Sequence, residues 1–144
     1  MLRRIRWALL TLALLPAAAG AQEVSYTLVV HTSNPVKSLT RDQVSRIFLR
    51  KATLWGNSKP VLPVDQAPDA AVRRTFTKRI HQRTIASVQT WWQQQTFAGI
   101  GVAPPERGSD VGVLDYVRKY PGAIGYVRAG VALGAGVKAI DVTP

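Results

Sequence analysis

Short runs of β-forming residues alternate with longer amphipathic stretches along this 144-residue chain, and this alternation limits the fold more than any other feature. Runs of β-branched and aromatic residues bounded by turn residues are typical of strands. Apolar residues three or four positions apart are typical of helices that cover a sheet. We expect the order of strand, helix, strand, three helices and two strands to fold as an α/β domain, with helices layered on one small mixed β-sheet.

Four segments carry the strand pattern. The first is YTLVV at 26–30, which ends in the polar sequence HTSNP. The second is VLPV at 61–64, where Pro63 lacks a backbone donor and therefore favours an edge of the sheet. The last two are AIGYV at 123–127 and GVKAIDV at 136–142.

Capping patterns indicate where the helices begin. Thr40 with Gln43 forms a capping-box pattern before a helix over 41–50. Thr84 can cap a third helix, and Ser109 or Asp110 a fourth, which ends near Tyr120 before Pro-Gly.

The second helix begins near Ala70 and has Val72, Phe76 and Ile80 on one face. We expect its basic side chains to face solvent. They are Arg73, Arg74, Lys78 and Arg79.

Residues 1–21 have the pattern of a secretory signal peptide, with three arginines, an apolar run and a small-residue cleavage site before Gln22. An uncleaved anchor is the alternative, but the apolar run is shorter than the roughly 20 residues that a span requires. We expect residues 22–144 to form one domain in the periplasm of a Gram-negative bacterium. The chain has no cysteine, which excludes disulfides, thiolate metal sites and a lipid-modified amino-terminal cysteine.

The formal net charge is +11, and removal of the signal-peptide arginines leaves +8 on residues 22–144. Such a surplus attracts anions of any kind. Nucleic acid is not expected as a partner, because the chain has neither a base-reading helix nor an aromatic and basic strand pattern.

Catalysis has little support in the sequence. His31 and His81 stand in no pattern with a nucleophilic serine or a metal-ligand spacing, and the eight carboxylates form no acid/base motif. We therefore expect a binding protein that is not an enzyme and holds no metal or other cofactor.

Three polar loops, each after a strand or before a helix, are candidate anion sites. Backbone amides at a helix start, hydroxyls and arginines can bind an oxyanion, although ordinary helix capping would use the same residues. The candidate residues are Ser33 and Asn34, then Gln66, Asp69, Ala70 and Arg73, and finally Arg107, Gly108, Ser109 and Asp110.

The adjacent Trp91 and Trp92 are candidates for contact with a partner. Neighbouring residues on a helix point about 100° apart, so both cannot face the same core unless the helix is largely covered. We expect one of them to meet a second surface, with the protein core as the alternative.

The succession of SLTRDQVSRIF, LWG, PVLPVDQ before AVRRTF, WW and GSDVGVLDYVRKYPGAIGYV resembles the phosphate-binding receptors of phosphate ABC transporters. The likeness extends from about Val29 to Val127 and is most specific in PGAIGYV. It indicates a small PstS-like member of the type 2 periplasmic binding protein superfamily, the size of a single lobe. The resemblance implies a lobe-like fold and a binding function.

In the larger receptors of this family, a Ser-Gly-Thr sequence opens a helix and holds phosphate between two lobes, with an arginine close by. The matching positions here read Ala67-Pro68-Asp69-Ala70. We expect Asp69 to accept hydrogen bonds from the amides that phosphate would need, so that the helix caps itself and the carboxylate repels an anion. Replacing Asp69 by serine is then expected to raise oxyanion affinity.

Two functions follow from these observations. In the first, the protein binds phosphate or another small oxyanion weakly, as a relative of transport receptors. In the second, it is a protein-interaction module that keeps the receptor fold without the ligand. Because one lobe supplies only one wall of a clamp, a homodimer, a membrane transporter or another periplasmic protein is the expected partner.

Overall fold

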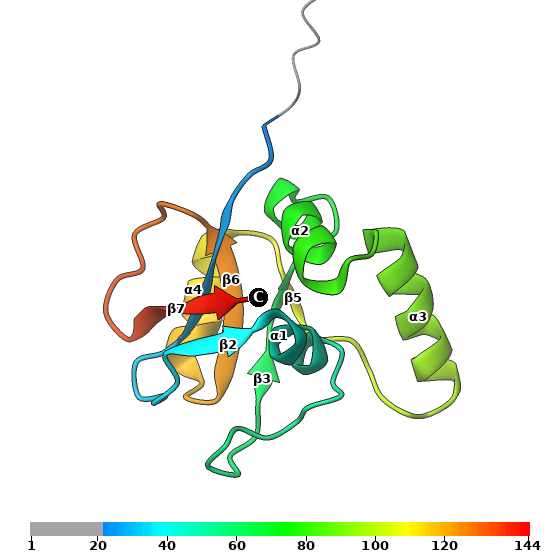
Figure 1. Cartoon of the computed structure of the whole chain (residues 1–144), viewed down its shortest axis with the longest axis horizontal. Coiled ribbons are helices and arrows are strands. Elements are labelled where there is room, and N and C mark those ends of the chain that lie inside the picture. The colour runs from blue at the N-terminus through cyan, green and yellow to red at the C-terminus, as the bar shows by residue number, and fades with distance from the viewer. Residues whose placement is uncertain (1–21) are drawn as a thin grey trace, which may run out of the picture.

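The computed structural model describes residues 22–144, so the predicted signal peptide lies outside the described residues. Figure 1 shows helices packed around a central sheet. The elements in chain order are β1 (Tyr26–His31), β2 (Ser38–Thr40), α1 (Arg41–Phe48), β3 (Leu62–Pro63), β4 (Asp65–Gln66), α2 (Ala71–Phe76), the π-helical turn η1 (Thr77–His81), α3 (Ile85–Phe97), β5 (Glu106–Arg107), α4 (Asp110–Lys119), β6 (Ala123–Arg128) and β7 (Val137–Thr143).

The described residues form a five-stranded mixed sheet in the order β2-β7-β1-β6-β3 and a separate pair, β4-β5. Strand β1 runs antiparallel to both of its neighbours, with Leu28 opposite Tyr126 on one side and Ile140 on the other. Strands β2 and β3 run parallel to β7 and β6, respectively. Four strands therefore end at the same edge of the sheet, and only β1 ends at the opposite edge.

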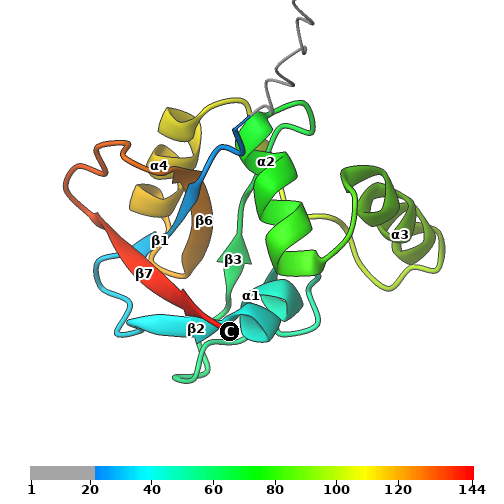
Figure 2. The same ribbon diagram turned by 45° about the horizontal axis from the view of Figure 1, so that its top comes forward.

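Alternate side chains of the strands point to two different cores. Leu28, Val30 and Tyr126 pack against α1, α2 and η1, whereas Val29 and Val127 pack against α4. This period of two is expected for a sheet covered on both faces. The result is a three-layer domain with α4 on one face and α1, α2 and η1 on the other, as Figure 2 shows from a second direction.

Side chains of α4 pack directly against the backbone of β6 at Gly125. A Cβ atom at this position would lie 2.7 Å from Val113 Cγ1 and 2.8 Å from Val64 Cγ1, closer than real Cβ contacts allow. The most family-like part of the sequence, PGAIGYV, thus contains a glycine that the packing requires.

Helix α3 stands to the side of the main body (Figures 1 and 2). It is attached through a small cluster of Leu49, Val88 and Trp92, with Trp91 packed against this cluster. Trp92 is only 8% exposed, whereas Trp91 is half-buried with the Lys51 ammonium over its ring. One tryptophan therefore belongs to the core, and the other lies partly at the surface.

The predicted fold class is confirmed, and the four predicted strands and four predicted helices are all present. Thr40 makes the expected capping box, Thr84 and Ser109 cap their helices, and β3 with Pro63 is an edge strand. Strands β2, β4 and β5 were not predicted from the sequence, because segments of two or three residues are too short to show a period.

No helix among residues 22–144 has both the length and the apolar character needed to span a bilayer.

Candidate functional site

A polar cluster, called the polar centre below, lies at the edge where β3 and β6 end; most of its residues are buried, but Glu106 and Arg128 are exposed. The pairing of β4 with β5 places Asp65 beside Glu106 and Gln66 beside Arg107. Helix α2, the first residue of α4 and the end of β6 complete the cluster. The polar centre consists of Asp65, Gln66, Arg73, Glu106, Asp110, Tyr126 and Arg128.

Asp65 and Arg73 form an ion pair in the interior, with 3.2 Å between Asp65 Oδ2 and Arg73 Nη2. Asp65 Oδ1 accepts hydrogen bonds from the Tyr126 hydroxyl and from the backbone amide of Gln66. Arg73 Nη1 donates to the carbonyl oxygen of Gln66 and, at 2.9 Å, to Glu106 Oε1. These contacts link four elements, β4, β5, β6 and α2, to one another.

Gln66 and Asp110 connect this pair to the start of α4 and the end of β6. Gln66 Nε2 donates to Asp110 Oδ1 at 2.8 Å and to the Tyr126 carbonyl at 3.1 Å. The Asp110 carboxylate also accepts from the backbone amide of Arg128 at 3.1 Å and from its Nε at 2.7 Å. The oxygen atoms that could have faced a ligand therefore have partners within the chain.

The two buried aspartates respond differently to this environment. Burial raises the pKa of Asp65, although the positive charge of Arg73 and the Tyr126 hydroxyl oppose the shift. The pKa of Asp110 is lowered, because its hydrogen bonds with Arg128 and Gln66 outweigh the desolvation that acts in the opposite direction. Tyr126 is fully buried, and its pKa is raised well above the usual value by burial and by Asp65.

The charges of the polar centre nearly cancel. Its three carboxylates, from Asp65, Glu106 and Asp110, face two guanidinium groups, from Arg73 and Arg128. A dianion that entered this cluster would meet no surplus of positive charge. The free-energy cost of removing the dianion from water would therefore not be compensated. Within residues 22–144, no three His, Asp or Glu side chains converge as they would around a metal ion.

Arg73 contradicts the sequence prediction that the basic residues of the second helix face solvent. Its side chain is 5% exposed, whereas Lys78 and Arg79 are 74% and 62% exposed, as predicted. Arg73 is buried because Asp65 and Glu106, from two other segments, supply the compensating charge. Arg73 Nε has no hydrogen-bond partner, and the side chain also lines a groove of about 500 Å³ beneath α3.

The predicted self-capping by Asp69 is wrong. The N-cap of α2 is Ala70, no side chain caps this helix, and Asp69 is exposed. The backbone carbonyl oxygen of Asp69 accepts a hydrogen bond from Arg74 Nη1 at 3.2 Å. Asp65 is the aspartate of this loop that occupies the interior.

The third predicted loop lies beside the polar centre but uses its groups internally. The Ser109 hydroxyl accepts from the Gly112 amide, which is the ordinary capping alternative. The Arg107 guanidinium lies over the Tyr116 ring at 5.1 Å and donates to the Glu106 carbonyl. Gly108 is exposed between them.

The structure does not bring Ser33 and Asn34 to this site. They follow β1, whose direction is opposite to that of the other strands, so they lie at the far edge of the sheet. The Ser33 hydroxyl bonds to His31 Nδ1, and Asn34 Oδ1 accepts from the Val36 amide. Both residues stabilise a local turn.

The sequence analysis missed Glu106, Tyr126 and Arg128 as members of the cluster. Their partners are 33, 61 and 18 positions away along the chain. Tyr126 lies within a strand of apolar appearance, and its role depends on a register that the sequence alone does not provide. Only Arg128, a cation directly after a buried strand, could have been suspected from its position.

A family model for a PBP superfamily domain, PBP_like_2, matches residues 24–142, and the chain therefore belongs to the periplasmic binding protein (PBP) superfamily. Members of this superfamily are typically binding proteins and not enzymes. No curated protein matches the sequence of the chain.

Several solved structures share the fold. One is described as a phosphate ABC transporter substrate-binding protein from Clostridium perfringens with bound phosphate, at 22% identity and a TM-score of 0.64. An ABC-type phosphate transport receptor from Vibrio cholerae has 20% identity and a TM-score of 0.65, and PstS from Borrelia burgdorferi has 10% and 0.63. Each match covers 83% of this chain but only 45%, 46% and 47% of the other chain, respectively. The chain therefore spans less than half the length of these structures, which agrees with the predicted lobe-sized domain.

Proposed function

We propose that this protein is an exported, non-enzymatic binding domain that uses the receptor fold to bind another protein in the periplasm, without enclosing phosphate. The observation that carries this proposal is the internal pairing of charges in the polar centre. Its carboxylates and guanidinium groups pair with one another, and the charges nearly cancel. A site of this kind stabilises a fold better than it attracts an oxyanion.

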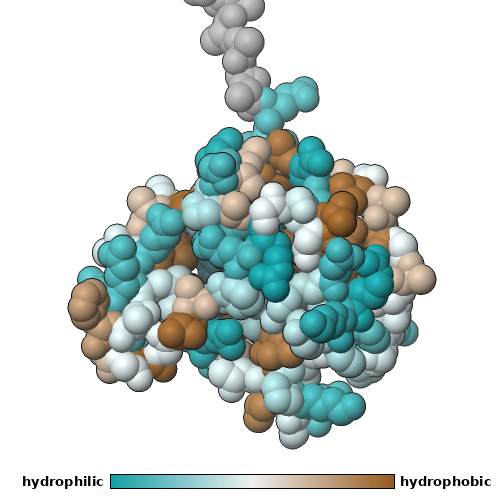
Figure 3. All heavy atoms as spheres, turned by 180° about the vertical axis from the view of Figure 1, so that it is seen from behind, coloured by the Kyte–Doolittle hydropathy of each residue, from teal (hydrophilic) through white to brown (hydrophobic). Residues whose placement is uncertain are grey.

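The surface around α3 supports a protein partner. Phe97, Ile100 and Val102, at the end of α3 and in the segment after it, are 94%, 72% and 64% exposed. Exposed apolar residues that occur together are typical of protein contact sites. Figure 3 shows apolar side chains among polar ones on the side of the molecule where α3 lies, and others at the top and on the opposite side.

Weak binding of phosphate or another small oxyanion is the second candidate function. It is favoured by the fold shared with a phosphate-bound structure and by the start of α2, where no side chain caps the backbone amides. A single lobe supplies only one wall, so a homodimer or a transporter subunit would have to complete such a site.

Two measurements separate these functions. Calorimetric titration of the purified protein with phosphate and with sulfate is expected to give no heat at millimolar ligand. A photo-crosslinking residue in place of Gln93 on α3 is expected to give a discrete protein adduct in the periplasm, whereas one in place of Asp115 on α4 gives none. Micromolar affinity for phosphate, or adducts of equal yield from both positions, would overturn the proposed function.

A further inference from the structure

We propose that a basic groove next to the polar centre binds an extended acidic segment of a partner protein. This inference rests on the proposed function and names its partner class. The basic groove is defined by Arg41, Arg74, Lys78, Arg79, Gln82 and Arg83.

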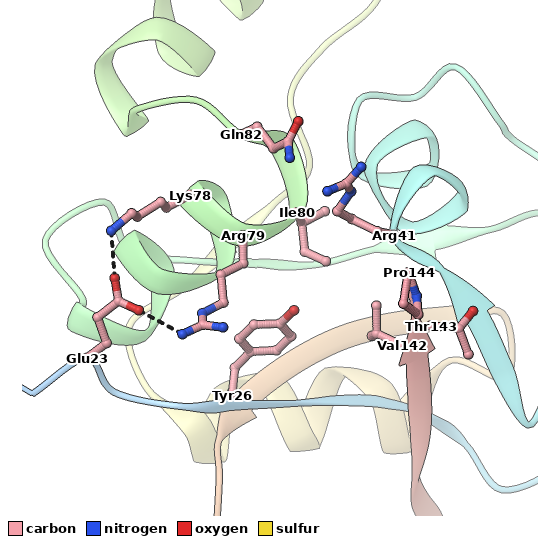
Figure 4. A pocket seen from close by; sticks show the side chains of 10 residues that line it. All are labelled: Glu23, Tyr26, Arg41, Lys78, Arg79, Ile80, Gln82, Val142, Thr143 and Pro144. Carbon is pink, nitrogen blue, oxygen red and sulfur yellow. Dashed lines mark hydrogen bonds and ion pairs between the residues drawn. The ribbon is translucent and has the colours of Figure 1, made fainter.

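The groove consists of two adjoining hollows along α2 and η1. One, of about 470 Å³, lies between η1 and the edge of the sheet at Tyr26 and Val142, as Figure 4 shows. The other, of about 600 Å³, lies between η1 and the start of α3 at Ile85. The two hollows lie on either side of η1, and Lys78 and Gln82 line both of them.

The positive charge of this groove is largely uncompensated, unlike that of the polar centre. Among residues 22–144, no carboxylate lies within 4.0 Å of Arg41, Arg74 or Arg83, and Lys78 and Arg79 share the single carboxylate of Glu23. Five cationic side chains therefore face one acidic side chain. A partner of complementary charge would gain both association rate and specificity from this arrangement.

Glu23 shows how a carboxylate fits this surface. It belongs to the irregular segment before β1, and its two oxygens accept from Lys78 Nζ at 2.8 Å and from Arg79 Nη2 at 2.9 Å (Figure 4). These hydrogen bonds, that of Lys78 first, lower the pKa of Glu23. The groove already binds one acidic side chain on a segment that is neither helix nor strand, and the remaining arginines can bind further ones in the same way.

The residues that line the groove favour a polypeptide partner over a membrane surface. Proteins that lie on membranes present apolar side chains that enter the bilayer. The exposed large apolar residues of residues 22–144 do not line either hollow. They are Leu54, Phe97, Ile100, Val102 and Val111.

The spacing of the cations suggests the pattern of acids in the partner. Arg74 and Lys78 are four residues apart, which on a helix is a rise of about 6 Å. Side chains at every second position of an extended chain are about 6.6 Å apart. An extended peptide with glutamate at alternate positions therefore matches the groove.

The test measures the fluorescence anisotropy of a labelled decapeptide of alternating glutamate and serine, titrated with the purified protein at low salt. The double variant Arg74→Gln with Arg83→Gln is expected to weaken binding about tenfold, because two exposed charge pairs are lost. The matched control, Lys37→Gln with Lys138→Gln, removes the same charge from the β2–β7 side and should weaken binding less than about twofold. Equal losses in the two double variants, or no binding by the unmodified protein, would overturn the inference.

Glu23→Gln provides a test in the opposite direction. It removes the internal acid from Lys78 and Arg79, and we expect it to strengthen peptide binding by about threefold. Unchanged or weaker binding would contradict the groove as the site.

Competition experiments identify the source of the acidic groups, and crosslinking experiments separate this inference from the proposed function. Vesicles with anionic lipid and inorganic phosphate are expected to compete poorly with the peptide, and preferential binding of either through Arg74 and Arg83 would overturn a peptide partner. A photo-crosslinking residue in place of Gln82 should give the same adduct as the one at Gln93. An adduct from Gln93 alone would refute the groove and leave the proposed function standing, whereas micromolar phosphate binding would refute the proposed function itself.

Discussion

The polar centre and the basic groove lie on either side of one helical segment, α2 with η1. Positive charge is paired with carboxylates in the polar centre and is largely unpaired in the basic groove. Arg73 is 5% exposed and is paired with two carboxylates. Its neighbour Arg74 is exposed, and within residues 22–144 it donates to a backbone carbonyl and forms no ion pair. Buried charges are tolerated only when they are paired, and exposed charges remain available to other molecules. The comparison shows that the positive charge of this protein marks a binding surface only where the chain itself leaves it uncompensated.

The largest expected effect tests this contrast with two adjacent residues. Arg73→Leu should lower the free energy of unfolding by about 3–5 kcal/mol, because Asp65 is left buried without its partner. Arg74→Leu should change it by less than about 0.5 kcal/mol. Urea denaturation of both variants measures the difference, and similar losses would show that the polar centre is not the structural unit described here.

The next effect concerns His81, which lies in η1 and contacts the Ser45 hydroxyl of α1 at 2.9 Å. Burial, assisted by the positive charges of Arg83 and Arg73, lowers the pKa of His81 from 6.5 to about 4. A base with a lowered pKa stabilises the fold above its unfolded pKa, and this stability is lost as the pH falls from about 6.5 towards 4. The loss amounts to about 3 kcal/mol at most.

His81→Asn should remove this part of the pH dependence and leave a flatter stability profile between pH 6.5 and 4. Unfolding curves at several pH values measure it. An unchanged slope in the variant would mean that His81 is not held neutral between η1 and α1.

A smaller effect is expected for Tyr126→Phe, which deletes the hydroxyl that donates to Asp65. The cost should be about 1–3 kcal/mol, the range for leaving a buried acceptor without its donor. Because the pKa of Asp65 is raised in the fold, the stability from this group is present below its unfolded pKa of 3.8 and declines as the pH rises. The hydroxyl stabilises the ionised form, so the cost of Tyr126→Phe should grow with pH.

Tyr116→Phe is the matched control for this variant. Tyr116 is half-buried, and within the described part of the chain its hydroxyl makes no hydrogen bond that the geometry identifies, so its loss should cost less than about 0.5 kcal/mol. Equal costs for the two variants would show that the bond to Asp65 contributes nothing to stability.

These variants also show what the sequence can and cannot predict. Caps at Thr40, Thr84 and Ser109 and the strand at 26–30 depend on neighbours in the sequence, and they were predicted correctly. The burial of Arg73 depends on carboxylates 8 and 33 positions away, which meet it only because β4 pairs with β5. Without knowledge of those carboxylates, a basic residue on a helix is predicted to face solvent.

The separation of the predicted loops has the same origin. Gln66 and Asp110 are joined by a hydrogen bond at one edge of the sheet, whereas Asn34 lies at the other edge. Which edge a loop occupies follows from strand direction, and strand direction cannot be read from the periodicity of one segment. Only part of the predicted set therefore lies together.

The smallest expected effect concerns Asp69, which lies at the boundary between the two regions. Its carboxylate does not cap α2, so Asp69→Ser should change the free energy of unfolding by less than about 0.5 kcal/mol, whereas loss of a working cap in Ser109→Ala should cost about 1 kcal/mol. The same variant should not acquire phosphate binding, because the nearby polar centre still offers no surplus of positive charge. If calorimetry shows phosphate binding in Asp69→Ser that the unmodified protein lacks, then one exposed carboxylate is what keeps anions from the start of α2. The paired charges of the interior would then not be the reason that this edge is closed to phosphate.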